Sequence, residues 1–153
     1  MRAIVKILLY LATAVALTGV YFVANYLGLY LKLHYYGIAP LWPAAGISVA
    51  LLWLGGLRWW PVILVGEVLS MYFLGLPLLR GAAGAMSQLV EALLAVWLLR
   101  RAAVDPMFSR SRDVLLFMLL GCLLPTIVGG GIGIAGMAYN QLLSMDEIGR
   151  AHV

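Results

Sequence analysis

The chain has 153 residues, of which 65% are hydrophobic and only 10% are charged. Its mean hydropathy is +1.04, whereas a soluble domain is nearer half apolar and a quarter charged. This composition excludes a water-soluble globular protein and predicts an all-α integral membrane protein with about five transmembrane helices. The formal net charge of +4 is therefore interpreted as setting orientation or touching anionic lipid, and nucleic acid is not an expected partner.

Residues 4–30 form the first predicted helix. Arg2 and Lys6 precede an apolar stretch that continues to Leu31, which is too long for the apolar region of a secretory signal. At about 1.5 Å per residue, the helix is long enough to cross an apolar layer of about 30 Å with some tilt. Polar and aromatic side chains near its far end are interpreted as an interfacial cluster: Tyr21, Asn25, Tyr26 and Tyr30.

The segment 40–61, PLWPAAGISVALLWLGGLRWWP, organises the middle of the chain. Trp42 near its start and two tryptophans near its end are typical of a membrane helix anchored at both interfaces. Pro43 suits a first helical turn, where an N–H would have no intrahelical acceptor. Pro77 is expected to kink or end the next helix. The four helices predicted after the first cover residues 42–57, 60–79, 82–99 and 114–139.

Small residues mark the last two predicted helices. The fourth helix begins with several residues that permit close contact with a neighbouring helix: Ala82, Ala83, Gly84, Ala85 and Ser87. The fifth contains Pro125 and a glycine-rich run over 129–136, which favour flexibility or close packing and are compatible with a break in the helix. The run GGGIGIAG is not a dinucleotide loop, because it lies in an apolar segment with no strand before it.

Catalytic and metal-binding patterns do not emerge from the sequence. Cys122 is the only cysteine, which excludes an intrachain disulfide and a cysteine metal site. It is interpreted as a small buried apolar residue. No nucleophile with a base and no phosphate loop is found, so we expect no enzyme, no cofactor and no metal within these residues.

The basic residues predict the orientation of the helices. With the N-terminus inside, the predicted outside segments contain only Lys32 and Arg80 before the last few residues. The inside segments contain seven basic residues: Arg2, Lys6, Arg58, Arg100, Arg101, Arg110 and Arg112. Basic residues accumulate on the cytoplasmic side, so this asymmetry predicts a cytoplasmic N-terminus.

Residues 147–153 are interpreted as a non-native tail. The hexapeptide IGRAHV, Ile148 to Val153, is what the codons ATC GGA AGA GCA CAC GTC encode, and that string resembles a sequencing adapter. The preceding AG of the adapter fits a GAG codon for Glu147. Residues 1–146 are then expected to be the front part of a larger helical bundle.

Four segments spread over the chain carry a family resemblance: LWPAAGI, LLWLGGLRWWP, EALLAVWLLRR and DPMFSRSRDVLLF, which begin at Leu41, Leu51, Glu91 and Asp105. Over 42–139 the chain resembles the first membrane-associated sensor domain family, MASE type 1. Two positions depart from the pattern: Gln88 stands where asparagine is common, and Glu67 stands where a small residue is expected.

The resemblance implies a multi-pass sensor domain of the bacterial plasma (inner) membrane. Such domains have about eight membrane helices and precede cytoplasmic output modules, usually sensor histidine kinases, diguanylate cyclases or phosphodiesterases. The expected partners are the lipid bilayer, a missing C-terminal output domain, a small ligand that the sequence does not identify, and a second copy of the chain in a homodimer.

Two acidic residues within the apolar helices are the leading candidates for a ligand site. Glu67 follows Arg58 by nine residues, and Glu91 precedes Arg100 by nine. Both carboxyls then lie about 13 Å from the inner edge, near mid-membrane, and are expected to face each other across two neighbouring helices. Helical spacing adds three further ligand candidates: Ser70, Ser87 and Gln88. The alternative is a protonated glutamate that only packs against a neighbouring helix.

The remaining singled-out residues have simpler interpretations. Trp42 and Pro43 are an interface anchor and a helix start, and three arginines act as topology determinants: Arg58, Arg100 and Arg101. Three functions stay open at this point. The first is a truncated sensory input domain, the second a substrate-binding membrane subunit of a small-molecule transporter, and the third a membrane scaffold without a ligand.

Overall fold

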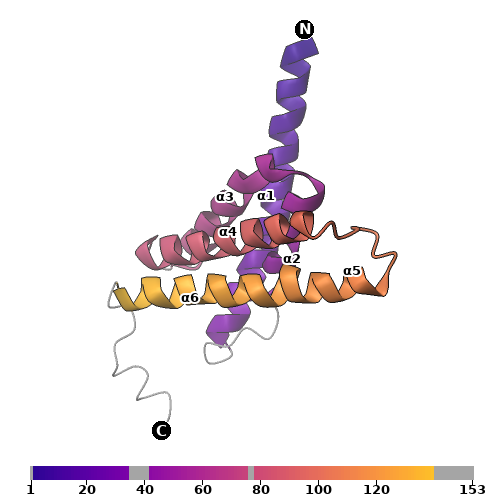
Figure 1. Cartoon of the computed structure of the whole chain (residues 1–153). Helices are drawn as coiled ribbons and strands as arrows, with labels where there is room; N and C mark the ends of the chain where they lie inside the picture. The colour runs from indigo at the N-terminus through magenta and orange to yellow at the C-terminus, as the bar shows by residue number, and fades with distance from the viewer. Residues whose placement is uncertain (1, 35–41, 76–77, 140–153) are drawn as a thin grey trace.

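A computed structural model of the chain is helical throughout most of the residues that it describes, which are 2–34, 42–75 and 78–139 (Figure 1). The predicted non-native tail lies outside these residues. The elements are α1 (Arg2–His34), α2 (Pro43–Leu54), the 3-10 turn η1 (Leu57–Trp59), α3 (Trp60–Phe73), α4 (Leu78–Arg101), α5 (Ser111–Leu116), the π-helical η2 (Phe117–Leu123) and α6 (Leu124–Tyr139).

Helix α4 is the central element, because it packs against α2, α3, η2 and α6. It lies beside α6, and the two helices are connected through the 102–110 loop and α5 (Figure 1). Helix α1 crosses this pair and packs along α3 and α2. The N-terminal half of α1 extends beyond the other helices in Figure 1, and its apolar side chains are exposed from Ile4 to Leu11.

The C-terminal half of α1 is docked through one helical face. Its buried residues are Tyr21, Ala24, Asn25, Gly28 and Leu29, which follow the i, i+3, i+4, i+7, i+8 spacing of a packed helix face. The ring of Trp42 packs on this face at Gly28, where an added Cβ would lie 3.0 Å from the ring. The apolar core continues through α2, α3 and α4, with fully buried Leu52, Ile63 and Leu99.

The segment from α2 to α3 follows the sequence pattern closely. Pro43 opens α2, and the helix ends at Leu54, before the two glycines and short of the expected residue 57. Gly56 has φ 97°, a conformation that side chains with a Cβ rarely adopt. Helix α3 ends at Phe73 instead of the expected residue 79, and Gly75 follows with φ 64°. Pro77 lies outside the described residues, and α4 begins at Leu78 instead of residue 82.

The last helix is continuous instead of broken. It runs from Ser111 to Tyr139, and its irregularity is the π-helical turn Phe117–Leu123 just before Pro125. Proline lacks an N–H and its ring collides with the carbonyl four residues earlier. A π-turn widens the helix locally and takes up this misfit. Gly121 lies within the turn and is buried, with Phe117 and Leu99 within 3.4 Å of an added Cβ.

Two helical segments are long and apolar enough to cross a membrane: Ile4–Leu31, with mean hydropathy 2.1, and Ser111–Gly136, with mean hydropathy 2.2. Helices α2 and α3 have 12 and 14 residues, which correspond to about 18 and 21 Å at 1.5 Å per residue. An apolar bilayer core is about 30 Å thick. Five crossings therefore remain a prediction for this chain.

Candidate functional site

Glu67 is the most buried acidic residue of the described bundle, with 2% of its surface exposed. It lies on α3 and faces α1. The Tyr21 hydroxyl donates a hydrogen bond to Glu67 Oε1 at 3.1 Å, and the Asn25 amide donates one to Oε2 at 2.9 Å. One turn later on α3, the Ser70 hydroxyl donates to the Gly66 carbonyl at 2.7 Å and lies 3.4 Å from the Phe22 carbonyl of α1. These contacts tie α1 to α3.

The interpretation of Tyr21 and Asn25 as interfacial residues is wrong. Both side chains are completely buried, because the i, i+4 spacing places them together on the docked face of α1. Gly66 makes this contact possible, since a Cβ there would lie 2.4 Å from Tyr21 Cδ1. The missed signal was the spacing of Tyr21, Ala24, Asn25 and Gly28, which marks a polar and small helix face.

Glu91 faces a different helix. The Thr126 hydroxyl on α6 donates a hydrogen bond to Glu91 Oε1 at 2.8 Å. One turn earlier on α4, the Ser87 hydroxyl donates to the Gly129 carbonyl at 2.5 Å. A Cβ on Gly129 would lie 2.9 Å from both Glu91 Cβ and Oε2, so only glycine permits this approach. Small residues at such a seam are how membrane helices come close enough to exchange polar contacts.

Gln88 makes a third contact, toward α2. Its amide Nε2 donates to the Ser48 hydroxyl at 3.1 Å, and Ser48 in turn donates to the Ala45 carbonyl at 2.8 Å. Ser48 is fully buried and Gln88 is 8% exposed. An amide–hydroxyl pair in the interior fixes the register of α4 on α2, because an unpaired polar group there would be unfavourable.

The five predicted ligand residues therefore divide into three contacts. Glu67 and Ser70 lie against α1, Ser87 and Glu91 lie against α6, and Gln88 lies against α2. Within the described residues, no hydrogen bond joins the two carboxyls that were expected to face each other. Two of the three contacts involve α4, so a displacement of this helix would affect its contacts with both α2 and α6.

The three arginines that were predicted to set the topology also contact groups within the bundle. Arg100 donates from Nη2 to the carbonyls of Leu52, at 3.2 Å, and Trp53, at 3.4 Å. Arg100 thus bonds carbonyl oxygens in the last turn of α2, which have no N–H partner within the helix. Its positive charge is also favourable there, because the C-terminal end of a helix dipole is negative. Arg58 lies over the ring of Trp59 at 5.2 Å, and Arg101 lies over Trp97 at 5.8 Å.

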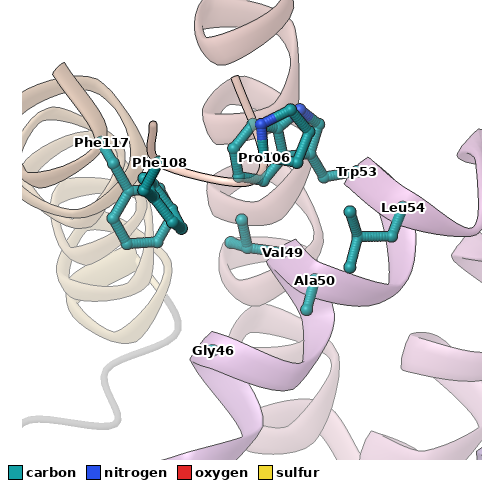
Figure 2. A pocket seen from close by; sticks show the side chains of 8 residues that line it. All are labelled: Gly46, Val49, Ala50, Trp53, Leu54, Pro106, Phe108 and Phe117. Atoms are coloured by element: carbon teal, nitrogen blue, oxygen red, sulfur yellow. The ribbon is translucent and has the colours of Figure 1, made fainter. Parts of the chain in front are cut away.

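An apolar cavity of about 160 Å³ lies between α2 and the 102–110 loop. Figure 2 shows Val49, Ala50, Trp53 and Leu54 of α2 facing Pro106, Phe108 and Phe117, with Gly46 further along α2. Trp53 stacks on Phe117 with ring centroids 6.0 Å apart, and Phe108 meets both rings at steep angles. None of the five predicted ligand residues lines this cavity.

The 102–110 loop is held by Asp105. Its carboxylate accepts hydrogen bonds from the Met107 amide, at 3.0 Å, and from the Ser109 hydroxyl. The hydrogen bond from Ser109 lowers the pKa of Asp105 below its usual value. Arg112 donates to the Ala102 carbonyl at 3.5 Å and connects the start of α5 to the end of α4.

The described residues form an apolar helical bundle whose helices are joined by hydrogen-bonded polar side chains, and two of its segments are long and apolar enough to cross a membrane. The MASE1 family model matches residues 13–151, and the chain belongs to this family of membrane-associated sensor domains. The predicted resemblance is thereby confirmed. No curated protein and no solved structure matches the chain.

Proposed function

We propose that the chain is the sensory input part of a bacterial signal-transduction protein in the plasma membrane. Its output partner would be a sensor histidine kinase or an enzyme of cyclic-di-GMP turnover. Membership of a sensor domain family supports this role. The observation that carries it further is the polar seam between α4 and α6, where Glu91 meets Thr126 and Ser87 meets Gly129.

The proposed mechanism uses competition for these polar groups. A small polar ligand that bonds Glu91 displaces Thr126, and the α4–α6 seam then shifts, because that bond and the Ser87 bond define its register. Helix α4 ends at Arg101, on the side assigned to the cytoplasm, and Gln88 connects it to α2. A ligand shifts such an equilibrium only by its differential affinity for the two arrangements.

Substitution of Glu91 tests this function in a protein that joins this domain to an output enzyme. Glu91→Gln keeps size and hydrogen bonding, so the fold is expected to persist while the half-maximal stimulus shifts. The variant replaces a hydrogen bond to a charged group, about 1.5–3 kcal/mol, by a neutral one, about 0.5–1.5 kcal/mol, so a shift of roughly tenfold is expected. Glu91→Leu is expected to do more damage, because Thr126 then loses its partner. Output activity against stimulus concentration is the measurement.

Met86→Leu is the matched control for these variants, because Met86 lies on the same helix and is 52% exposed. It is expected to leave the dose–response curve unchanged. A Glu91→Gln variant whose output equals that of the parent under every stimulus and pH would remove Glu91 from signalling and leave it a packing role.

The proposed orientation has the N-terminus and the 102–110 loop in the cytoplasm. Reporter fusions at Lys32, Arg58, Arg80, Asp105 and Asn140 are expected to give periplasmic signals at Lys32, Arg80 and Asn140 and cytoplasmic signals at the other two. The physical reason is the excess of basic residues in the segments assigned to the inside. A cytoplasmic signal at Arg80 or Asn140 would contradict the arrangement.

A further inference from the structure

The cluster around Glu67 has more oxygen acceptors than donors. The carboxylate receives one hydrogen bond on each oxygen. The Asn25 side-chain oxygen Oδ1 is buried and has no hydrogen-bond partner, although the nitrogen of the same amide bonds Glu67. Asn25 is fully buried, so bulk solvent does not reach this oxygen. An orphan acceptor next to a buried carboxylate points to an absent positive charge.

Among the residues whose side chains the structure describes, no charged group on the elements that pack against α3 supplies this charge. Arg58 on η1 lies over Trp59, and on α4 Arg100 bonds α2 while Arg101 lies over Trp97. Lys6 lies four turns of α1 away from Tyr21. Glu91 on α4 is a second acidic residue, and it accepts a hydrogen bond from Thr126 on α6. The described partners of the Glu67 carboxylate are the uncharged side chains of Asn25 and Tyr21.

We propose that Glu67, Asn25 and Tyr21 form a binding site for one monovalent cation, a proton or a sodium ion. The atoms of these three side chains that can coordinate a cation are all oxygens, and oxygen ligands favour hard cations. One carboxylate balances one positive charge, whereas a divalent ion would leave a net charge in the apolar interior. This assignment goes beyond the sensory role and is independent of it.

The geometry accommodates such a charge with a small movement. A half-turn of the Asn25 amide exchanges its nitrogen and oxygen, which are nearly equal in size. It places Oδ1 where Nδ2 now lies, 2.9 Å from Glu67 Oε2. Two oxygens at this separation share a proton in an O–H···O hydrogen bond. A sodium ion is larger than a proton, so it would bind only after these two oxygens move further apart. The Tyr21 hydroxyl, which bonds Glu67 Oε1, would be its further ligand.

The bound charge also stabilises the packing of α1 on α3. When the site is vacant, Glu67 is an ionised carboxylate without a counter-charge in an apolar interior, which is strongly unfavourable. The folded chain thus binds the cation more tightly than the unfolded chain does. Stability is then expected to fall as the pH rises in the absence of sodium, and to recover when sodium is added.

Thermal unfolding of the purified 153-residue chain in lipid nanodiscs tests this inference. Sodium chloride is exchanged for N-methyl-glucamine chloride at constant ionic strength, at pH 5, 7 and 9. Above half-saturation, each tenfold rise in sodium is expected to raise the melting temperature by about 3–6 °C at pH 9. At pH 5 sodium is expected to have no effect, because the proton already occupies the site. Glu67→Gln should abolish both dependences.

Tyr21→Phe keeps the carboxylate and provides a second test in case Glu67→Gln does not fold. Loss of a hydrogen bond to a charged group is expected to move the pH midpoint upward by about one unit, or to weaken sodium binding about tenfold. Tyr72→Phe is the control, because it removes a hydroxyl from the exposed face of α3, the helix that carries Glu67. It should change neither the pH midpoint nor sodium binding.

The outcomes separate the two cations. A pH dependence that Glu67→Gln removes, without a sodium effect, identifies the proton as the ligand. A sodium effect at high pH that Glu67→Gln removes identifies sodium in competition with the proton. Two results would overturn the site. In the first, the stability of the wild-type chain depends on neither pH nor sodium. In the second, the pH and sodium dependences persist unchanged in Glu67→Gln and Tyr21→Phe. No output domain enters the measurement, so failure of the sensory proposal leaves the result unaffected.

Discussion

Gly66→Ala is expected to lower the melting temperature of the chain by about 2–12 °C, although it adds a single methyl group. The new Cβ would lie 2.4 Å from Cδ1 of Tyr21 and 3.2 Å from Cε1. The tyrosine ring is rigid and fully buried, so relief requires α1 to move away from α3. Overpacking of this kind destabilises by about 1–3 kcal/mol, and each kcal/mol shifts the melting temperature of a chain of this size by about 2–4 °C.

Gly19→Ala is the matched control, because Gly19 lies on α1 with nothing within 4 Å of an added Cβ. It is expected to leave the melting temperature unchanged or to raise it slightly through helix propensity. A double-mutant cycle with Tyr21→Ala completes the test. Once the ring is gone, Gly66→Ala should be nearly neutral. An equal effect of Gly66→Ala in both backgrounds would mean that Tyr21 is not the obstacle.

The sequence predicted helix starts and ends best where special residues impose them. Pro43 opens α2 as expected, and the paired glycines at 55 and 56 end it, since Gly56 adopts a positive φ. Periodicity and apolar runs gave the helical class and the approximate segments. These special residues did not always give the right position: α3 stops at Phe73, before Gly75 with its positive φ, whereas residue 79 was expected.

Tertiary partners were much harder to predict, because intramembrane polar residues bond across helices that are distant in the sequence. The sequence shows Glu67 and Glu91 as acidic residues within apolar helical segments. Their partners are 35 to 46 residues away in α1 and α6, and no local pattern specifies which neighbour each one meets. Tyr21 was misread because aromatic residues near a helix end resemble an interfacial belt, whereas burial on a packed face depends on where α3 docks.

The response of the last helix to Pro125 also depended on context. Proline can break a helix, kink it or be accommodated by a widened turn, and the residues alone permit all three. The observed π-turn keeps α5, η2 and α6 in one line along α4. A break would have separated Phe117, which packs near Leu99, from Gly129, which packs against Glu91. Continuous contact with α4 therefore favours the widened turn.

Gly129→Leu is expected to separate α4 from α6. A Cβ at this position lies 2.9 Å from Glu91 and 3.3 Å from the Ser87 carbonyl, which belongs to the backbone and cannot move aside. The larger side chain should destabilise the bundle by about 1–3 kcal/mol and break the bonds at Ser87 and Glu91. The adjacent Gly130 has nothing within 4 Å of an added Cβ, so Gly130→Leu is the matched control.

A disulfide across the same seam measures the separation directly. A Cβ on Gly133 would lie 3.7 Å from the Ser87 Cβ, which matches the usual Cβ–Cβ distance of about 3.8 Å in disulfides. Ser87→Cys with Gly133→Cys, in a Cys122→Ala background, should therefore form an intramolecular bond under mild oxidation. Gly129→Leu is expected to prevent this bond, because it moves α6 away from Ser87, and Gly130→Leu should leave it intact. Equal cross-linking in both variants would show that the seam tolerates a side chain at Gly129 and does not depend on close contact there.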